Sequence, residues 1–332
     1  MIDGLDGRSN RTNLGYGFTP STSKREIPEI SDPLYTVFEK WIKKCPHIAL
    51  LHVNIQPNIH PQLGDRKDHD NLTGLVNNLY VMALEEIARI QDVTSKKPED
   101  IHSVALTFGK EGRILENAGI FLSAFYNIID EKDILFNLET EASINLIGYR
   151  LSQGKRLALT THSGHYTGLD CFGDILNYGI NHGIDMAEHC EGNVVNFGES
   201  EVIARYSKGI AINCGRAASL GFLNSGVAIN FGKSRINPST HEGLSVNCES
   251  WKQKDKKSPT VLRIKYPGGK YQTMNPKEAG KYPKLVRYLK DLKGKIEAYR
   301  NLQFPECLDV FDVLEQEIGN KYIFEQKIKE LL

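Results

Sequence analysis

The middle of the chain repeats one glycine-led motif: GDILNYG at residues 173–179, GNVVNFG at 192–198, GIAINCG at 209–215, GVAINFG at 226–232 and GLSVNCE at 243–249. The leading residues are Gly173, Gly192, Gly209, Gly226 and Gly243, which lie 19, 17, 17 and 17 residues apart. Residues 154–160 (GKRLALT) repeat the pattern once more without its asparagine. A fixed period of this size is typical of proteins whose repeat units stack on one another.

The length of the period selects the architecture. A unit of 17 residues holds one short strand between glycines, and it is too short for the strand, crossover helix and return strand of a βαβ unit. The chain must therefore coil in turns of β-structure alone, with equivalent strands about 4.8 Å apart. A second row of small residues runs through the same coils at Gly168, Ala187, Ala204 and Gly221 and ends in Pro238. The sequence thus predicts an α+β protein built around a short parallel β-helix of about six coils.

Alternation along each strand predicts which side chains are buried. The first, third and fifth residues after the glycine are apolar in the later coils, as in Ile210, Ile212 and Cys214, and we expect them to face the core. The fourth position carries Asn177, Asn196, Asn213, Asn230 and Asn247. Stacked amides can hydrogen-bond from one coil to the next, so we interpret this row as a structural ladder, with ligand contact as the alternative. Cys214 and Cys248 are two coil steps apart, about 9.6 Å, so we expect both to stay reduced.

The repeat resembles a known type of protein. The segments GHYTG at residues 164–168 and SLGF at 219–222, with the glycine-led strands, are similar to the glycine-rich β-helix repeats of two families. These are the C-terminal domain of glutamate synthase and the C subunit of formylmethanofuran dehydrogenase. The resemblance covers residues 148–258. It implies a structural β-helix that holds catalytic domains or subunits together and carries no cofactor of its own, so no cofactor is expected.

Patterns outside the repeat divide the chain into four parts. Residues 1–32 are interpreted as a flexible tail and 33–147 as a mainly helical domain, and the β-helix is placed at 148–275. In residues 276–332, Leu285, Leu289, Leu292 and Ile296 recur at spacings of three and four, which predicts C-terminal helices. We expect helices at either end to cap the open edges of the β-helix.

Histidines and acidic residues are the candidates for catalysis. A loop after a predicted strand at residues 47–55 gathers His52, His60 and Asp65, and the first coils hold His162 and His165. Loops after strands often carry function, so one hypothesis is a hydrolase-like or metal-dependent enzyme with its site between the helical domain and the first coils. The candidate metal ligands are His162, His182 and His189. Turn and surface roles are the alternative for these residues, and no metal site is expected.

The charge distribution bears on partners. The chain has 41 Lys and Arg against 41 Asp and Glu, which gives no overall bias toward nucleic acid or membranes. Residues 251–300 carry 15 basic and 4 acidic residues, whereas residues 301–332 carry 3 basic and 7 acidic ones. This asymmetry fits either two helices that pair through charge or an RNA-binding surface in residues 251–300.

The remaining observations concern location and the kind of function. No apolar run is long enough to cross a membrane, and the first residues lack a secretory signal. The six cysteines contain no C-x-x-C pair, so a reducing, cytoplasmic location is expected. Together these observations favour a non-catalytic scaffold that binds a protein partner or copies of itself.

Overall fold

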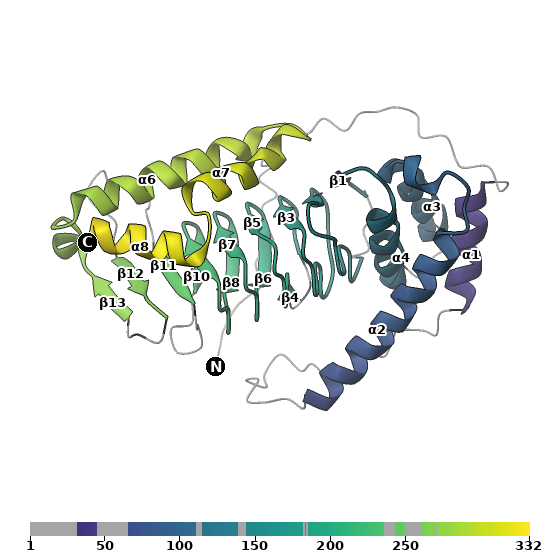
Figure 1. Cartoon of the computed structure of the whole chain (residues 1–332), viewed down its shortest axis with the longest axis horizontal. Helices are drawn as coiled ribbons and strands as arrows, with labels where there is room; N and C mark the ends of the chain where they lie inside the picture. Colours follow the sequence, from purple (N-terminus) through teal and green to yellow (C-terminus); the bar gives the residue numbers. More distant parts are fainter. Residues whose placement is uncertain are drawn as a thin grey trace, which may run out of the picture.

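The computed structural model describes residues 32–44, 66–110, 115–138, 144–181, 183, 185–235, 243–249, 261–267, 269 and 271–332. In this part of the chain, a parallel β-solenoid lies between a group of N-terminal helices and a layer of C-terminal helices (Figure 1). The predicted strand at 47–55 and the loop with His52, His60 and Asp65 lie outside the described residues.

The N-terminal helices are α1 (Pro33–Lys44), α2 (Arg66–Ile87), α3 (Pro98–Lys110) and α4 (Leu115–Ile128), with a 3₁₀ turn, η2 (Val93–Ser95). α1 buries Leu34, Phe38 and Trp41, which recur at helical spacing. α4 is the central helix, because every residue from 118 to 126 is buried. A helix that is buried all round needs neighbours on all sides.

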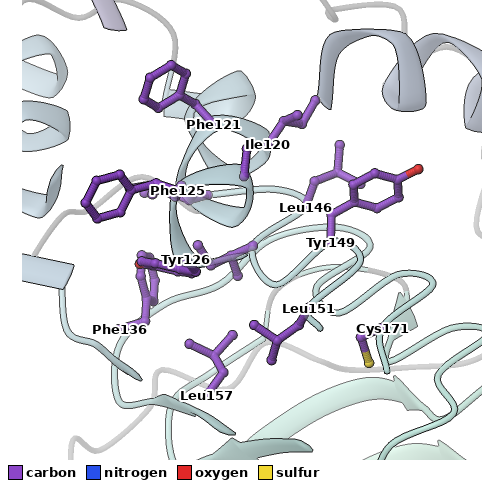
Figure 2. Close-up of a cluster of buried hydrophobic side chains, with 14 of the residues drawn as sticks. Ile120, Phe121, Phe125, Tyr126, Phe136, Leu146, Tyr149, Leu151, Leu157 and Cys171 are labelled. Carbon is purple, nitrogen blue, oxygen red and sulfur yellow. The ribbon is translucent and has the colours of Figure 1, made fainter. Parts of the chain in front are cut away.

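α4 seals the first turn of the solenoid. The Ser123 hydroxyl donates to the Leu146 carbonyl (3.0 Å) and accepts from the Tyr149 amide (3.1 Å). The Asn127 side chain accepts from the amide of Ser152 (2.7 Å). Figure 2 shows Phe125 and other α4 side chains gathered above the residues of that turn. Backbone groups that a further coil would pair are thus satisfied by α4, and a helical cap is present at this end.

One long sheet runs through the solenoid. Its strands, in spatial order, are β1 (Asp133–Phe136), β2 (Arg156–Leu159), β3 (Asp174–Asn177), β5 (Val194–Asn196), β7 (Ile210–Asn213), β9 (Val227–Asn230), β11 (Leu244–Glu249), β12 (Val261–Lys265) and β13 (Tyr271–Met274). The strands from β1 to β11 pair in parallel with equivalent residues in register, which confirms the predicted stacking. β12 and β13 join antiparallel and end the sheet. Because β1 belongs to this sheet, the solenoid begins at Asp133 rather than at the predicted residue 148.

The glycine rows mark places where one coil approaches the next. A Cβ on Gly209 would lie 1.9 Å from the carbonyl oxygen of Gly192, and one on Gly243 would lie 1.9 Å from that of Gly226. No side chain fits at that distance. The second predicted row has another cause, because Gly168, Ala187, Ala204 and Gly221 adopt left-handed φ angles of 70°, 59°, 59° and 69°. Pro238 lies outside the described residues.

A second, shorter sheet forms the other side of the coils. It contains β4 (Asp185–Met186), β6 (Glu199–Ile203), β8 (Arg216–Leu220) and β10 (Lys233–Arg235), which pair in parallel. The left-handed corners lie between this sheet and the next strand of the long sheet.

The long sheet is buried on both faces, which corrects the predicted division into core and outer residues. The second position of each strand, as in Val194 and Ala211, packs inside the solenoid, together with the asparagines. The odd positions, such as Ile210 and Ile212, are buried on the outer face instead. They pack beneath the C-terminal helices, so the apolar pattern reflects a second core outside the coils.

The C-terminal helices run along the sheet and do not cap its end, which corrects the predicted capping role (Figure 1). They are α5 (Pro276–Ala279), α6 (Pro283–Glu297), α7 (Val310–Glu317) and α8 (Lys321–Leu331), with the 3₁₀ turns η3 (Ala298–Asn301) and η4 (Glu306–Asp309). α6 buries the predicted stripe Leu285, Leu289, Leu292 and Ile296 against the sheet. The Arg300 guanidinium donates to the Cys214 carbonyl (2.7 Å) and fixes the end of this layer.

Candidate functional site

Equivalent residues of successive coils form columns along the solenoid, and one column is the asparagine ladder. The amide nitrogen of each ladder residue donates to the amide oxygen of the next at 2.7, 2.8, 2.9 and 2.9 Å, through Asn177, Asn196, Asn213, Asn230 and Asn247. All five side chains are buried inside the coils. The ladder is therefore architectural, as the sequence predicts, and it presents no surface to a ligand.

The strongest candidate for a functional site is a buried charged cluster at one corner of the solenoid. A guanidinium nitrogen of Arg205 lies 3.2 Å from a carboxylate oxygen of Asp185, and another lies 3.8 Å from Glu188. Asp185 is 2 % exposed and Glu188 is 1 % exposed. The guanidinium carbon also lies 5.1 Å and 5.5 Å from the ring centroids of Tyr206 and Phe222. Charged groups this deeply buried require one another as partners.

The corner geometry brings the cluster together. Glu188 lies between the left-handed residues Ala187 and His189, and Arg205 lies between the left-handed Ala204 and Tyr206. The two segments therefore have the same local conformation in successive coils. The amide of His189 donates to the carbonyl of Arg205 (2.8 Å), which holds them side by side. The rings of His189 and Tyr206 stack in the adjacent column, with centroids 5.0 Å apart.

The electrostatics of the cluster favour a protonated Glu188. Burial raises the pKa of Glu188 to about 8, the nearby charge of Asp185 also raises it, and Arg205 lowers it. Two buried carboxylates share one guanidinium, so they resist being charged together. Near neutral pH the Glu188 carboxyl can thus hold a proton. Because the cluster is buried, its direct consequence is pH-dependent cohesion between coils.

The sequence contained a signal for this cluster that was missed. Glu188 and Arg205 have opposite charges 17 residues apart, which is the coil period. The same spacing places Lys208 2.6 Å from Glu191 and Arg216 3.0 Å from Glu199. A search for opposite charges at the repeat period would have predicted all three pairs.

The predicted histidine sites are not assembled among the described residues. The register pairs Ser163 with Asn181, so the position of His162 matches Ile180 and not His182. His182 itself lies outside the described residues. His189 stacks on Tyr206, in a different column from His162. His165 contributes its backbone amide, which donates to the side chain of Asn145 (2.8 Å). No group of three or more metal-ligating side chains occurs within the described residues.

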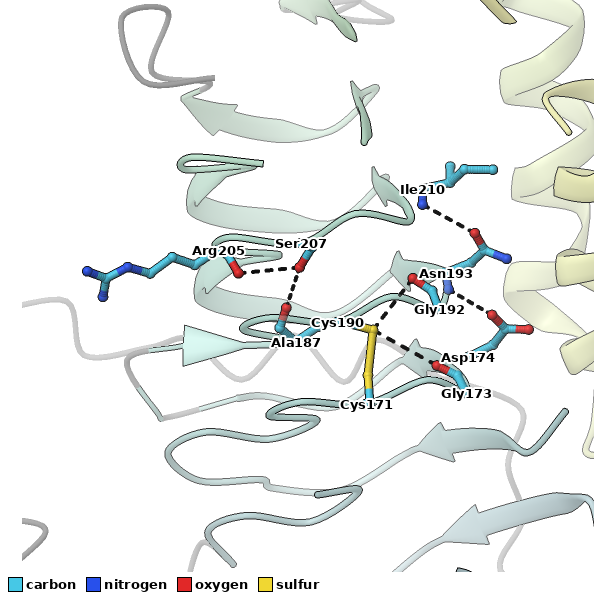
Figure 3. Close-up of a disulfide and its surroundings, with 10 residues drawn as sticks. All are labelled: Cys171, Gly173, Asp174, Ala187, Cys190, Gly192, Asn193, Arg205, Ser207 and Ile210. Atoms are coloured by element: carbon cyan, nitrogen blue, oxygen red, sulfur yellow. Dashed lines mark hydrogen bonds between the residues drawn. A yellow bond between two sulfur atoms is a disulfide. The ribbon is translucent and has the colours of Figure 1, made fainter. Parts of the chain in front are cut away.

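The cysteines differ in part from the prediction. Cys214 and Cys248 are buried free thiols, as predicted, whereas Cys171 and Cys190 form a disulfide between neighbouring coils, with their Cα atoms 4.7 Å apart (Figure 3). A side-chain chain runs beside it, in which Asp174 accepts from the amide of Asn193 (2.7 Å). Disulfides persist mainly in oxidising compartments. The cysteine argument for a cytoplasmic location is therefore removed.

Comparisons of the chain with protein-family models, curated proteins and solved structures found no match. The likeness to glycine-rich β-helix proteins stays a prediction. Among the described helices, none combines the length and the apolar character required to span a membrane.

Proposed function

We propose that this protein is a non-catalytic scaffold, in which the solenoid holds α2 as a docking surface for a protein partner. The observation that carries the proposal is an exposed apolar stripe on α2. Leu75, Val81 and Met82 are 36 %, 42 % and 37 % exposed. Their spacing places them on one side of the helix, with Asn78 between them. Contiguous apolar side chains on a surface are typical of protein-binding sites.

The opposite side of α2 is fixed to the body of the protein. Val76, Leu79 and Ala83 are buried in the core that α2 shares with the first turn of the solenoid. Tyr80 accepts a hydrogen bond from Asn127 (2.7 Å), and Asn77 accepts one from Arg150 (2.6 Å). A surface on such a support does not have to be ordered when a partner binds, which lowers the entropic cost of association.

Site-specific photo-crosslinking tests this function. A benzophenone side chain at position 82 of the full chain is expected to yield one discrete adduct in an extract of the native host. The same probe at position 208, on the exposed solenoid surface, should not yield that adduct. Leu75→Asp with Val81→Asp should abolish the adduct and leave the folding stability within about 0.5 kcal/mol, since both sites are surface positions.

Two results would contradict the scaffold proposal. One is an identical set of adducts from positions 82 and 208, which would mean that α2 has no preferred partner. The other is loss of folding in the Leu75→Asp, Val81→Asp variant, which would give the stripe a role in the core. The mass of the adduct distinguishes a different protein from a second copy of this chain.

A further inference from the structure

The exposed charges of the C-terminal helices separate into two stripes. The basic stripe consists of Lys281, Lys284, Arg287 and Lys290, before and along α6. The acidic stripe consists of Glu306, Asp309, Asp312 and Glu315, along η4 and α7. All eight side chains are exposed, and in both stripes the residues recur every three positions. The two stripes therefore match in number of charges and in spacing.

The stripes lie toward opposite ends of the solenoid. The basic stripe begins just after α5, which packs against β12 and β13. The acidic stripe lies beside β2, where a guanidinium nitrogen of Arg156 is 3.5 Å from Asp309. Figure 1 shows α6 starting near β13 and α7 lying toward β3. β2 and β12 are six strand steps apart, about 29 Å at ~4.8 Å per step.

That separation prevents the stripes from neutralising each other. The Debye length at physiological salt is about 8 Å, so charges about 29 Å apart are screened from one another. Arg156 does not cancel the acidic stripe, because both of its bonds to Asp133 are 2.7 Å long and that carboxylate offsets its charge.

The basic stripe also differs from the neighbouring lysines of α6. Lys293 lies 3.7 Å from Glu297, and Lys295 pairs with Glu317. The predicted pairing of a basic helix with an acidic one is thus present at the end of α6. Within the described part of the chain, Lys281, Lys284 and Arg287 form no such ion pair.

We propose that copies of this chain associate head to tail, with the basic stripe of one copy against the acidic stripe of the next. The contact joins two different surfaces, so it is heterologous and propagates into rings or filaments. It goes beyond the scaffold function and does not depend on the α2 surface.

A second copy accounts for more of the structure than an RNA strand does. RNA would use the basic stripe and would be repelled by the acidic one. Stacking of bases also needs accessible aromatic rings, whereas Tyr266, Tyr282 and Tyr288 pack against the outer core. Tyr288 in addition donates its hydroxyl to the Glu317 carbonyl (2.9 Å).

The expected association is weak and depends on salt. Exposed ion pairs contribute about 0.2 to 1 kcal/mol each and are screened as ionic strength rises. Sedimentation velocity of the full chain at high concentration should show oligomers at about 0.05 M salt and mainly monomer at about 0.5 M. A wild-type chain that stays monomeric at low salt overturns the proposal without requiring any variant.

Charge reversal identifies the surfaces. Lys284→Glu with Arg287→Glu removes the basic stripe, and Glu306→Lys with Glu315→Lys removes the acidic one. Each variant alone should sediment as a monomer at low salt. Their mixture should associate again, because the native stripes pair and the two reversed stripes pair as well. The control is Lys208→Glu with Glu191→Lys, which exchanges an exposed pair elsewhere and should behave as the wild type.

The pattern of results separates the possible occupants. Monomers from both variants and recovery in the mixture support head-to-tail association. Loss of association in the basic variant alone, together with salt-dependent binding of a single-stranded RNA probe by the wild type, would assign that stripe to RNA and overturn the proposal. Oligomers that neither reversal affects would overturn it too.

Discussion

Asn177 illustrates how a side chain depends on its neighbour one coil away. Its buried amide oxygen has no hydrogen-bond partner among the described residues, because Leu159 occupies the ladder position of the preceding coil. Leu159→Asn would supply a donor there. Leu157→Asn buries the same amide inside the same coil without a ladder partner. We expect Leu159→Asn to be the milder change by about 1 to 3 kcal/mol. Urea melts measure both, and equal costs would mean that the ladder cannot extend.

Glu188 should give the protein a characteristic pH dependence. Its pKa is about 8 in the folded protein, against 4.5 as the ordinary value. The folded state thus keeps a proton that the unfolded state loses, so this contribution to stability is complete below pH 4.5 and is lost as the pH rises toward 8. We expect Glu188→Gln to flatten the decrease in unfolding free energy between these limits. Urea melts across that range test this, with exposed Glu191→Gln as the control.

The pH prediction has a clear contrary outcome. If the wild type and the Glu188→Gln variant lose stability in parallel as the pH rises, Glu188 is already ionised in the folded protein. The burial of the cluster would then be offset by Arg205 alone.

At the residue scale, the sequence predicted the asparagine ladder but not the charged cluster. Five identical residues at one position are visible without knowledge of the fold. Glu188 and Arg205 differ in type, and they become a pair only when the chain is folded at its period of 17. The histidines were overvalued for the opposite reason, because His162 and His189 are close in sequence terms but occupy different columns.

At the scale of a coil, the leading glycines should be irreplaceable. Gly209→Ala places a Cβ 1.9 Å from a backbone oxygen that cannot move without separating two coils. We expect a loss of about 3 kcal/mol or more in unfolding free energy. Gly74→Ala is the matched control, because that glycine is in α2 with open space around it, and it should gain about 0.5 to 1 kcal/mol. Chemical denaturation compares the two, and similar effects would refute the close-approach explanation.

At the element scale, periodicity predicted the strands and their stacking but misassigned their faces. Alternation separates odd from even positions, and it contains no information on which set lies inside the coil. Ile212 is apolar because α6 and its neighbours cover the outer face, and Asn213 is polar although it lies inside. A polar residue with satisfied hydrogen bonds can occupy an interior, so the usual inference from polarity fails here.

At the scale of the whole molecule, the C-terminal layer should be essential for solubility. A chain that ends at residue 275 uncovers the outer row formed by Leu176, Val195, Ile212 and Ile229. We expect it to aggregate, since an uncovered apolar sheet is a template for association. Replacement of these four residues by threonine in the shortened chain should restore a soluble β-rich protein. Size-exclusion chromatography and circular dichroism measure both; a soluble shortened chain without the threonines would contradict the prediction.

The relative placement of the parts was the least predictable level. The stripe of Leu285, Leu289, Leu292 and Ile296 predicts a helix with one buried face, and it is equally suited to covering an end or a side. The N-terminal cap could be anticipated only in kind, because its specificity comes from contacts such as that of Ser123 with Leu146. Such contacts join residues that share no sequence pattern.

The helix that covers the sheet also limits how this protein can evolve in length. α6 has 15 residues, about 22 Å of helix, which spans between four and five strands at ~4.8 Å each. Duplication of one 17-residue unit would be compatible with the stacking of the coils. It would nevertheless leave one outer strand bare unless the helix also grew by about three residues. Lineages of this protein should therefore change coil number and helix length together, in a fixed proportion.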